Sequence, residues 1–522
     1  MDDAHSLADV SRKARGLGVG LTGGANATSA AALVVGTLVA VVLVRLFLQW
    51  YRLSHVPGPF WAAFSKYWMV SESLKGRQPT AIKDVTDKYG SLARIGPNEL
   101  VTDDPEVLRR MMAVRSAYER GPWYDAMRFD PTRDNLFSMR DEAAHTLLRS
   151  KMAAGYSGKE NESMESTIET QIAALVHLIE TKYLSSSQDY RPMDLAQKSQ
   201  YFTLDVISHL AFGHAFGYLQ QDGDAYDYIK ITSSFIPIML VLANVPLLAN
   251  LLHSRPLRGL LPKGSDKLGF GAFIGVANKV VAERFAPHAA SQPDMLGSFL
   301  RHGLTQAEAS GEALLQVVAG SDTSASTIRI VMLSLMSNPA AYQRLQREIR
   351  DGIATGKISS PIKDAEARQL PYLQAVIKEG LRIMPPASGA FFKTVPPGGD
   401  MINGMFIPEG TQIGSSPFGI HHSKKTFGAD AELFRPERWL EADEQQLALM
   451  TNTVDLVFHH GKYQCLGKTV AMMEFDKVFV ELLREFDFSI ARPQTPAKIS
   501  NAGIWIIEDF WVRITKRGVD LS

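Results

Sequence analysis

The stretch LVFHHGKYQCLGKTVAMMEF, residues 456–475, contains Cys465, the only cysteine in a chain of 522 residues. Gly461 and Gly467 stand on either side of it, and glycine lets a backbone turn sharply and approach another group closely. The apolar periodicity after Gly467 predicts a helix, so the thiol lies at a helix amino terminus, where unpaired N–H groups stabilise a thiolate. A cysteine that only fills the core needs none of these features, which leaves a nucleophile or a metal ligand.

The residues around Cys465 do not favour a nucleophile. A nucleophilic thiolate needs a base, and His459 and His460 precede the cysteine across a glycine turn, which makes local pairing unconvincing. A thiolate in a glycine-bounded loop facing a flat ligand fits a haem iron better, because cysteine ligation pushes electron density onto iron and favours O–O cleavage.

The segment FHHGKYQCLG resembles the haem-binding loop of the cytochrome P450 monooxygenases, which reads Phe-x-x-Gly-x-(Arg/His)-x-Cys-x-Gly. Phe458, Gly461, Cys465 and Gly467 match this pattern. The resemblance implies that the cofactor is haem b, iron protoporphyrin IX, and that Cys465 is the axial ligand of its iron. Tyr463 departs from the pattern, and a phenol there can still donate a hydrogen bond to the haem edge.

A second informative segment lies in the longest helix that the sequence predicts, residues 305–337. No proline interrupts it before Pro339, and at 1.5 Å per residue the helix is about 50 Å long, the width of a whole domain. Its centre, AGSDTSAS at residues 319–326, has small and polar side chains where apolar core residues are expected. Serine and threonine can hydrogen-bond back to the backbone, so we expect this stretch to bend or open the helix.

The segment AGSDTS resembles the oxygen-activating segment of the central helix in cytochromes P450. By this resemblance Ala319 and Gly320 border the haem, and Gly320 leaves room for dioxygen and substrate. Thr323 is expected to hydrogen-bond dioxygen, and Asp322 to relay protons from solvent. Breaking an O–O bond requires protons at the outer oxygen, and a hydroxyl with a carboxylate is a minimal relay. The alternative is a polar stripe on a surface helix.

A third motif is the pair Glu379 and Arg382, which lie three residues apart and therefore on one helix face. Context distinguishes this pair, because prolines end its helix and FRPERW follows further along the chain. The resemblance implies that both side chains pair with Arg438 of FRPERW and hold the fold together behind the haem. The same spacing also occurs at Glu106/Arg109, Glu432/Arg435 and Glu481/Arg484.

Haem propionates need cations or hydrogen-bond donors. The segment DEAAHTLLRSK resembles the third helix of the family and places His145 and Arg149 one turn apart on one face. Lys393 in FFKTVPPGG occupies the place where the family often has an arginine. The resemblance implies that these three side chains contact the propionates, and the alternative for the helix pair is a solvated face.

The composition is that of a globular body, with 45% hydrophobic and 21% charged residues. The formal net charge of zero gives no basic footprint for nucleic acid. One cysteine excludes an internal disulfide framework and a multi-cysteine zinc or iron–sulfur site. No low-complexity linker or repeat follows residue 60, so we expect one catalytic domain over residues 61–522.

The amino-terminal region differs from this average. No charged residue occurs from Gly16 to Val44, and we expect an uncleaved transmembrane anchor at residues 29–50. A signal peptide or a buried core helix is the alternative, but the run is longer than a signal-peptide core. Residues 1–28 then form a lumenal tail, and the proline-rich residues 51–60 form a stiff connector. The positive-inside bias predicts a single-pass protein of the endoplasmic reticulum membrane with a cytosolic body.

The segment FIPIMLVLANVPLLANLLH is unusually apolar, but Pro237 and Pro246 interrupt it. We expect a helix–loop–helix with an apolar surface rather than a second membrane span. Core packing and a membrane-dipping lid over a substrate entrance both remain open.

The resemblance covers roughly residues 50–515 and implies the cytochrome P450 fold, mainly α with a smaller β region and a long central helix over the haem. The combination of RIGPNEL, VPPGG and YQCLGK resembles fungal, membrane-bound, pisatin-demethylase-like members of secondary metabolism. No Gly-x-Gly-x-x-Gly fingerprint follows a predicted strand, so electrons are expected from NADPH through a separate cytochrome P450 reductase, with cytochrome b5 as a second donor. The reductase is expected near Lys462, Lys468 and Lys477, unless these are ordinary surface lysines.

The reaction implied is insertion of one oxygen atom of O2 into a lipophilic small molecule, such as a terpenoid or polyketide. A haem-thiolate isomerase or dehydratase that needs no reductase is the first alternative, and the Asp322/Thr323 relay argues against it. A non-catalytic haem sensor and a cysteine hydrolase are the others.

Overall fold

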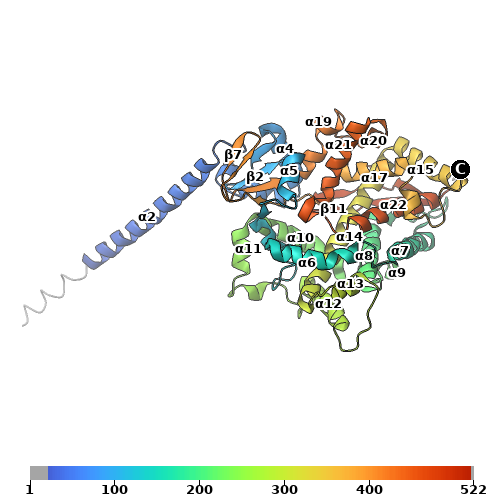
Figure 1. The fold of residues 1–522 in the computed structure, drawn as a ribbon, viewed down its shortest axis with the longest axis horizontal. Helices are drawn as coiled ribbons and strands as arrows, with labels where there is room; N and C mark the ends of the chain where they lie inside the picture. The colour runs from blue at the N-terminus through green and yellow to red at the C-terminus, as the bar shows by residue number, and fades with distance from the viewer. Residues whose placement is uncertain (1–21, 519–522) are drawn as a thin grey trace, which may run out of the picture. The chain divides into compact units, whose positions relative to one another are not determined.

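The computed structural model describes residues 22–518, and its contacts divide the chain into two compact units that meet between His55 and Val56. In the first unit, helix α2 (Thr22–Arg52) is exposed at every residue from 29 to 49 (Figure 1). The stretch Ser29–Arg52 has a mean hydropathy of 2.6 and is long and apolar enough to cross a membrane. The expected anchor therefore lies within α2, whereas most of the expected tail, residues 1–21, lies outside the described residues.

The second unit is mainly helical, as the sequence predicts, and its helices account for most of its length (Figure 1). Its α-helices are α3 (Tyr67–Leu74), α4 (Gln78–Tyr89), α5 (Pro105–Met112), α6 (Glu142–Tyr156), α7 (Met164–Leu178), α8 (Leu195–Phe212), α9 (Tyr218–Gln221), α10 (Tyr228–Asn244), α11 (Pro246–Leu252), α12 (Gly269–Arg284), α13 (Met295–Arg301), α14 (Gln306–Ser337), α15 (Pro339–Ala354), α16 (Asp364–Ala367), α17 (Pro371–Ile383), α18 (Pro417–His421), α19 (Lys424–Phe427), α20 (Arg438–Glu441), α21 (Glu444–Val454) and α22 (Lys468–Glu485).

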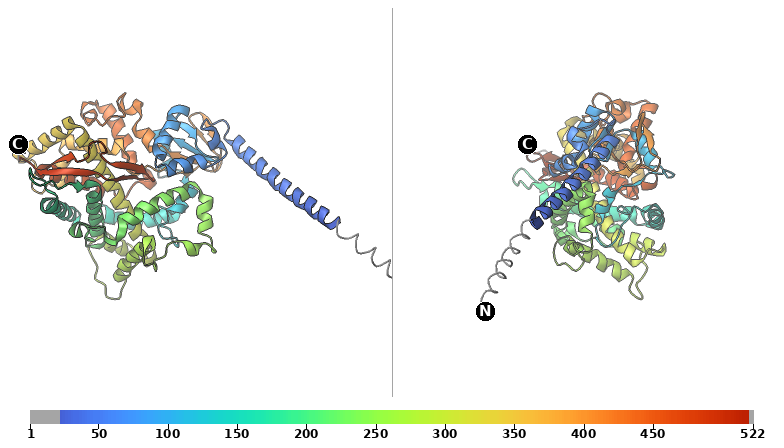
Figure 2. Two further views of the ribbon diagram at one scale, coloured as in Figure 1. Left: turned by 180° about the vertical axis from the view of Figure 1, so that it is seen from behind. Right: turned by 90° about the vertical axis from the view of Figure 1, so that its left-hand side faces the viewer.

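The smaller β region joins segments far apart in the sequence. One sheet has the strand order β1-β2-β8-β5-β3, and its β2–β8 pair is parallel. The β3–β5 pair is antiparallel and places Arg120 opposite Lys393. A second sheet has the order β4-β12-β9, and the C-terminal strands lie along one side of the body (Figure 2). The strands are β1 (Leu92–Arg94), β2 (Glu99–Thr102), β3 (Glu119–Arg120), β4 (Met193–Asp194), β5 (Lys393–Thr394), β6 (Asp400–Ile402), β7 (Met405–Ile407), β8 (Gln412–Ser415), β9 (Phe486–Ile490), β10 (Lys498–Asn501), β11 (Trp505–Glu508) and β12 (Trp511–Lys516).

Helix α14 is the long central helix, and a capping box of Thr305 and Glu308 begins it. Its polar centre bonds back to the backbone as expected: Ser321 Oγ donates to Val317 O at 2.7 Å, and Thr323 Oγ1 donates to Ala319 O at 2.8 Å. The helix nevertheless runs without interruption from Gln306 to Ser337, so the expected opening does not occur. Each hydroxyl uses a carbonyl that already accepts a helical N–H, and no backbone hydrogen bond has to break.

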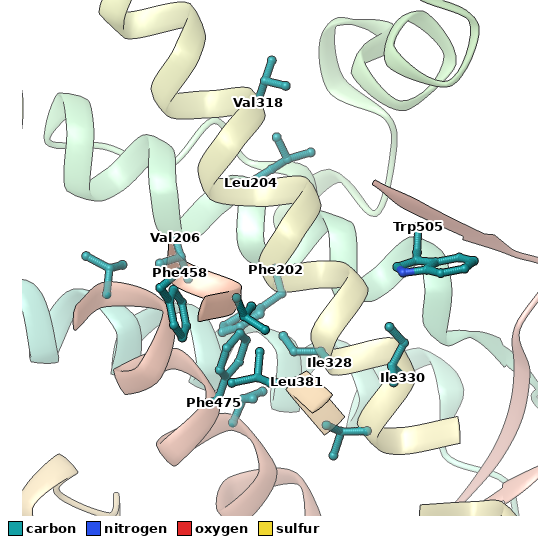
Figure 3. Packing of buried hydrophobic residues seen from close by; sticks show 14 of the residues in the cluster. Phe202, Leu204, Val206, Val318, Ile328, Ile330, Leu381, Phe458, Phe475 and Trp505 are labelled. Carbon is teal, nitrogen blue, oxygen red and sulfur yellow. The ribbon is translucent and has the colours of Figure 1, made fainter. Parts of the chain in front are cut away.

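The core gathers around α14. Helix α8 lies along it, and α17 and α22 contribute to the same cluster of buried apolar side chains. Figure 3 shows part of this packing, with side chains from α8 (Phe202, Leu204, Val206) beside side chains from α14 (Val318, Ile328, Ile330).

Pro237 does not break the apolar segment that contains it, contrary to the expectation from the sequence. It lies inside α10, whereas Pro246 occupies the first position of α11, where its missing N–H costs nothing. Burial of Met239 and Leu240 on one face of α10 offsets the hydrogen bond that Pro237 removes. The stretch Ala225–Asn244 is also long and apolar enough for a span, but α10 contacts α3, α11 and α12 and so belongs to the body.

Glu379 is the centre of a buried ionic network that joins α17 to the chain before Cys465. Arg382 donates to both of its carboxylate oxygens, at 2.8 and 2.9 Å, and Arg438 donates to Oε1 at 3.1 Å. Trp439 Nε1 donates to Oε2 at 3.0 Å. The Arg382 guanidinium also donates to three carbonyl oxygens, that of His421 at the end of α18 and those of Ala431 and Leu433. Every charge in this buried group therefore has a partner.

We predict that Glu379→Ala lowers the free energy of unfolding by about 3–5 kcal/mol, because it leaves the buried cations Arg382 and Arg438 without their anion. Denaturation of the detergent-solubilised full chain by urea measures the change. Glu106→Ala is the matched control, because Glu106 has the same spacing from Arg109 but is itself exposed, and an exposed ion pair contributes about 1 kcal/mol or less. Equal losses in the two variants would contradict a structural role for the Glu379 network.

Candidate active site around Cys465

A cavity of about 350 Å³ lies between α14 and the loop that carries Cys465. Side chains from the η2 segment Pro122–Met127, from α6, α10 and α14, and from the loop after Pro385 complete its walls. Of the residues predicted for the site, those that line the cavity are His145, Arg149, Ala319, Gly320, Asp322, Thr323, Phe458, Tyr463, Cys465 and Gly467. The sequence motifs therefore meet at one place, and Gly461 and Lys393 lie outside its lining.

The Cys465 loop is shaped by two glycines for different reasons. Gly461 has φ +56°, and a Cβ there would clash with Met112 O, so the turn itself requires glycine. A Cβ on Gly467 would meet no protein atom closer than Cys465 Sγ, at 3.8 Å. Gly467 therefore keeps open a space beside the thiol that the protein does not fill. The loop is closed by a hydrogen bond from Cys465 N–H to Phe458 O at 2.8 Å.

The Cys465 thiol is exposed toward the cavity and otherwise enclosed by protein. Burial raises the pKa of this thiol, while N–H groups of Gly467 and Lys468 and the charge of Arg149 act to lower it. The predicted donors at the start of α22 are present, but they do not by themselves produce a low pKa, because desolvation is the larger effect. A thiolate at this position therefore needs a further positive charge, such as a metal ion.

Neither His459 nor His460 pairs with the Cys465 thiol, which agrees with the prediction that local pairing is unconvincing. No histidine among the described residues hydrogen-bonds Cys465. The ring of His459 packs edge-on against Phe391, with ring centroids 4.7 Å apart. Burial and the nearby charge of Lys393 lower the pKa of His459 to about 3, so its ring is neutral. These facts argue against a cysteine hydrolase, which needs a base in contact with its nucleophile.

Helix α14 presents Ala319, Gly320 and Thr323 to the cavity. A Cβ on Gly320 would lie 2.7 Å from Ile207 Cγ1 of α8, a side chain that also lines the cavity. The close approach of α8 is thus a second reason for glycine here, beside the predicted room for dioxygen and substrate. Thr323 commits its hydroxyl proton to Ala319 O, which leaves the Thr323 oxygen available as an acceptor.

Asp322 lines the cavity but is almost fully buried, and two donors hold its carboxylate. Gln200 Nε2 donates to Oδ1 at 2.6 Å, and Tyr228 donates its hydroxyl proton to Oδ2 at 3.1 Å. Burial raises the pKa of Asp322 to about 6, while the Arg329 charge and the two hydrogen bonds oppose the shift. A carboxyl group with this pKa exchanges protons readily near neutral pH.

The other end of the cavity is cationic. His145, Arg149 and Arg120 all line it. Arg120 Nη1 donates to Leu136 O and Met139 O, both at 2.8 Å, but its buried Nε has no partner in the described part of the chain, and neither has His145 Nδ1. Burial and the charges of Arg120 and Arg149 lower the pKa of His145 to about 3. These unmatched donors and charges fit an anionic ligand group that enters from the cavity.

Tyr463 lines the cavity and also contacts two neighbouring side chains. Its hydroxyl donates to Glu142 Oε1, and its ring lies 3.4 Å from Lys393 Nζ. Lys393 is fully buried behind this ring and also contacts Tyr124 O–H at 3.2 Å. Burial and the charge of Arg120 lower the pKa of Lys393 well below its usual range. The Arg120 guanidinium also lies over the Tyr463 ring, 4.7 Å from the ring centre.

The three lysines near Cys465 do not form an exposed basic patch. Lys477 is fully buried and pairs with Glu165 at 2.7 Å and Glu169 at 2.8 Å. Lys468 pairs with Asp455 at 3.0 Å. Lys462 pairs with Glu142, leaving no surface cluster of unpaired lysines here. The predicted basic patch is wrong because Lys477, although close to Cys465 in sequence, lies on the face of α22 that packs against α7.

Gln200 and Tyr228 belong to the site but were not predicted for it, and Arg120 was not predicted as a contact of the propionates. Arg120 has a weak local signal, since it directly precedes the largely apolar segment GPWYDAM. Gln200 and Tyr228 have none, because each approaches Asp322 only through the packing of its helix on α14.

The comparisons with known proteins agree with this geometry. The family model described as Cytochrome P450 matches residues 56–509. The chain is 44% identical over 479 residues to cytochrome P450 monooxygenase ABA1 of Pyricularia oryzae, which covers 90% of this chain and 94% of that protein. It is 42% identical over 468 residues to cytochrome P450 monooxygenase aba1 of Botryotinia fuckeliana, covering 89% and 92%. It is 40% identical over 466 residues to abl1 of Leptosphaeria maculans, covering 87% and 82%.

A cysteine facing an apolar cavity under a long helix with a polar centre defines a haem-thiolate protein. The chain belongs to the cytochrome P450 family, and its activity is that of a monooxygenase. The family implies a haem-thiolate cofactor, a redox partner, O2 and a small-molecule substrate. The residues present fit that cofactor, since the Cys465 sulfur faces the cavity and Gly467 leaves the space beside it empty. The apolar helix α2 is a candidate membrane anchor.

We predict that Tyr463→Leu lowers the free energy of unfolding by about 3 kcal/mol, because it removes the ring beside a buried ammonium and a hydrogen bond to a carboxylate. Tyr463→Phe keeps the ring and removes only the hydrogen bond, so about half of that loss is expected. Urea denaturation of the solubilised full chain measures both. Tyr190→Leu, at an exposed tyrosine, is the control. Equal losses in the two Tyr463 variants would show that the contact with Lys393 contributes nothing.

Proposed function

We propose that this chain is a membrane-anchored haem b monooxygenase that inserts one oxygen atom of O2 into a lipophilic small molecule. The substrate class we propose is a terpenoid or polyketide of fungal secondary metabolism. The observation that supports this most directly is the placement of Cys465 and of the Asp322–Thr323 pair on one apolar cavity.

Cys465 would hold the haem iron through its sulfur, and the cationic end of the cavity would hold the propionates. Arg149 is the strongest donor for them, because it makes no ion pair or hydrogen bond with the rest of the described chain. Arg120 and His145 each offer an unpartnered nitrogen. The bound haem supplies thiolate-ligated iron chemistry that activates O2 and favours O–O cleavage. Phe458, Gly461, Gly467, Ala319 and Gly320 would shape the space around it.

Lys393, held by Tyr463, would also act on the propionates at the cationic end of the cavity. Lys393 does not line the cavity, so its charge would reach a propionate through the field it creates. Tyr463 holds the ammonium at its ring and directs its own hydroxyl to Glu142. Tyr463 is therefore a support for Lys393, and we do not assign it a direct propionate contact.

Asp322 and Thr323 would deliver protons for O–O cleavage. Thr323 Oγ1, whose proton is bonded to Ala319 O, can accept a hydrogen bond from a protonated oxygen in the cavity. Asp322, with a pKa raised to about 6 by burial, can take up and release the protons. A reaction that only rearranges a peroxide needs neither group, which favours the monooxygenase over an isomerase or dehydratase.

The cavity walls support a lipophilic substrate. The charged side chains in the lining lie at the cofactor end or on α14, namely Arg120, Arg149 and Asp322. The remaining walls are chiefly aromatic and aliphatic, with Trp123, Met127, Phe129, Leu136, Phe137, Ile236, Met239, Leu240 and Phe391. A substrate with few polar groups loses least on entering such a site.

The electrons are proposed to come from NADPH through a separate NADPH–cytochrome P450 reductase, with cytochrome b5 as a second donor. The sequence has no Gly-x-Gly-x-x-Gly fingerprint after a predicted strand, which is the context that nucleotide binding requires. Residues 29–50 would anchor the protein in the endoplasmic reticulum membrane, residues 51–60 would connect, and residues 61–522 would form one cytosolic catalytic domain. The positive charge that follows the apolar run supports this orientation.

We predict that the purified full chain, reduced and exposed to carbon monoxide, gives the red-shifted Soret band of a thiolate-ligated haem. Cys465→Ser is expected to abolish that band, because a hydroxyl does not supply the same soft ligand. His460→Ala, at an exposed neighbour, is the control and should keep the band. A colourless protein, or an unchanged band in Cys465→Ser, would overturn the proposed site.

Dependence on a reductase separates the monooxygenase from its rivals. Reconstituted with NADPH and the reductase, the wild-type protein is expected to consume O2, and omission of the reductase should stop consumption. O2-independent turnover of an organic peroxide alone would indicate an isomerase or dehydratase instead.

A further inference from the structure

Tyr228 is the only tyrosine whose hydroxyl contacts Asp322 within the described residues, and it approaches from α10, outside the motif that carries Asp322. Its oxygen lies 3.1 Å from Asp322 Oδ2 and 3.1 Å from Ser321 Oγ. The phenol is fully buried, and burial together with the Asp322 charge raises its pKa far above the usual range. Tyr228 therefore stays neutral and has one proton to donate.

Ser321 determines which hydrogen bonds the Tyr228 hydroxyl can make. Ser321 Oγ donates its only proton to Val317 O at 2.7 Å, so toward Tyr228 it can act solely as an acceptor. The Tyr228 proton thus has two possible acceptors, the Asp322 carboxylate and the Ser321 oxygen. Its single O–H can serve one of them well at a time.

The two acceptors match the two protonation states of Asp322. When Asp322 is ionised, Tyr228 donates to Oδ2, and a hydrogen bond to a charged acceptor is the stronger choice. When Asp322 is protonated, its own O–H can donate to the Tyr228 oxygen, and Tyr228 turns its proton to Ser321. Both states are then satisfied without movement of a heavy atom, which is what a buried group that repeatedly gains and loses a proton requires.

Gln200 holds the other oxygen of Asp322 in both states. Its Nε2 donates to Oδ1 at 2.6 Å, and its own carbonyl oxygen accepts from Arg329 Nη2 at 2.9 Å. Arg329 also donates to Ala196 O, so α8 fixes the orientation of the amide. The charged and titratable groups around this cluster are Arg329, with Asp194 and Glu508 facing it, and Tyr218, which faces Tyr228.

We propose that Tyr228 and Ser321 are positioning residues that form a hydrogen-bond switch, which stabilises Asp322 in both its ionised and its protonated state during proton delivery. The inference rests on the proposed function, because it assigns partners to the proposed relay. Tyr228 and Ser321 touch Asp322 or each other and need not touch substrate.

The switch predicts opposite effects of two substitutions. Tyr228→Phe removes the donor to the ionised carboxylate, so the pH midpoint of any process governed by Asp322 should move up by about one unit. Ser321→Ala removes the acceptor that Tyr228 needs when Asp322 is protonated, so the midpoint should move down. A loss of packing alone would not give shifts of opposite sign.

The partition of O2 between hydrogen peroxide and water measures Asp322 without knowledge of the substrate. With NADPH and the reductase, O2 + NADPH + H⁺ gives H2O2 + NADP⁺, whereas O2 + 2 NADPH + 2 H⁺ gives 2 H2O + 2 NADP⁺. Failure to protonate the outer oxygen releases the two-electron product. The peroxide fraction, measured against pH for the holoprotein with reductase in detergent, therefore reports the proton relay.

Tyr228→Phe is expected to raise the peroxide fraction severalfold at neutral pH and to shift its pH midpoint upward, and Ser321→Ala to shift it downward. Asp322→Asn should abolish the midpoint. Tyr218→Phe is the matched control, because the Tyr218 hydroxyl is buried without a partner, and it should behave as wild type. Shifts in the same direction, or no shift while Asp322→Asn has an effect, would overturn the switch.

The carbon-monoxide spectrum separates this inference from the proposed function. Absence of the thiolate band in the wild type would refute the proposed function, whereas an intact band with unmoved midpoints refutes only the switch. If Tyr228→Phe does not fold, the downward shift in Ser321→Ala decides the question, and an upward or absent shift counts against the proposal.

Discussion

The body depends on α14 being packed against α8 and bordering a cavity along the same few turns. Gly320 packs against Ile207 of α8 and also borders the cavity, which Ala319 and Thr323 line as well. A larger side chain at Gly320 would push α8 away, and larger ones at its two neighbours would fill the cavity. The polar centre of α14 is therefore a consequence of two constraints that meet within one turn, and Asp322 lies where they meet.

Two groups of buried charges in this structure differ in how completely they are satisfied. Around Glu379, the carboxylate and both arginines use their donors and acceptors, and the cluster connects α17 with the end of α18 and with the segment that leads to Arg438. At the cavity, Arg120 Nε and His145 Nδ1 are buried without partners. A complete network stabilises the chain by itself, whereas unmatched donors are costly unless something else supplies the acceptors. The second group is therefore best explained as a site where a ligand supplies the hydrogen-bond acceptors for Arg120 and His145.

Local patterns in the sequence were sufficient for the Cys465 loop and the long helix, because each depends on neighbouring residues. They were also sufficient to bring ten of the predicted site residues to one cavity. They failed where long-range packing decides. Lys477 looked like surface and is buried against α7, Pro237 looked like a helix end and lies within α10, and Tyr228 carried no signal at all. Pairing between distant elements has no signature in the sequence of either one.

Tyr463 shows how such pairing can compensate for a local departure. The loop lacks the Arg or His of the family's haem-loop pattern at this position, and two cationic side chains come instead from the β3–β5 pair, whose register places Arg120 opposite Lys393. The aromatic ring at 463 is in contact with both, so it can hold together charges that would otherwise repel. An arginine at 463 would add a third cation beside them, next to Glu142. The departure at Tyr463 and the presence of Lys393 are therefore best explained together, because each side chain makes the other tolerable in a buried site.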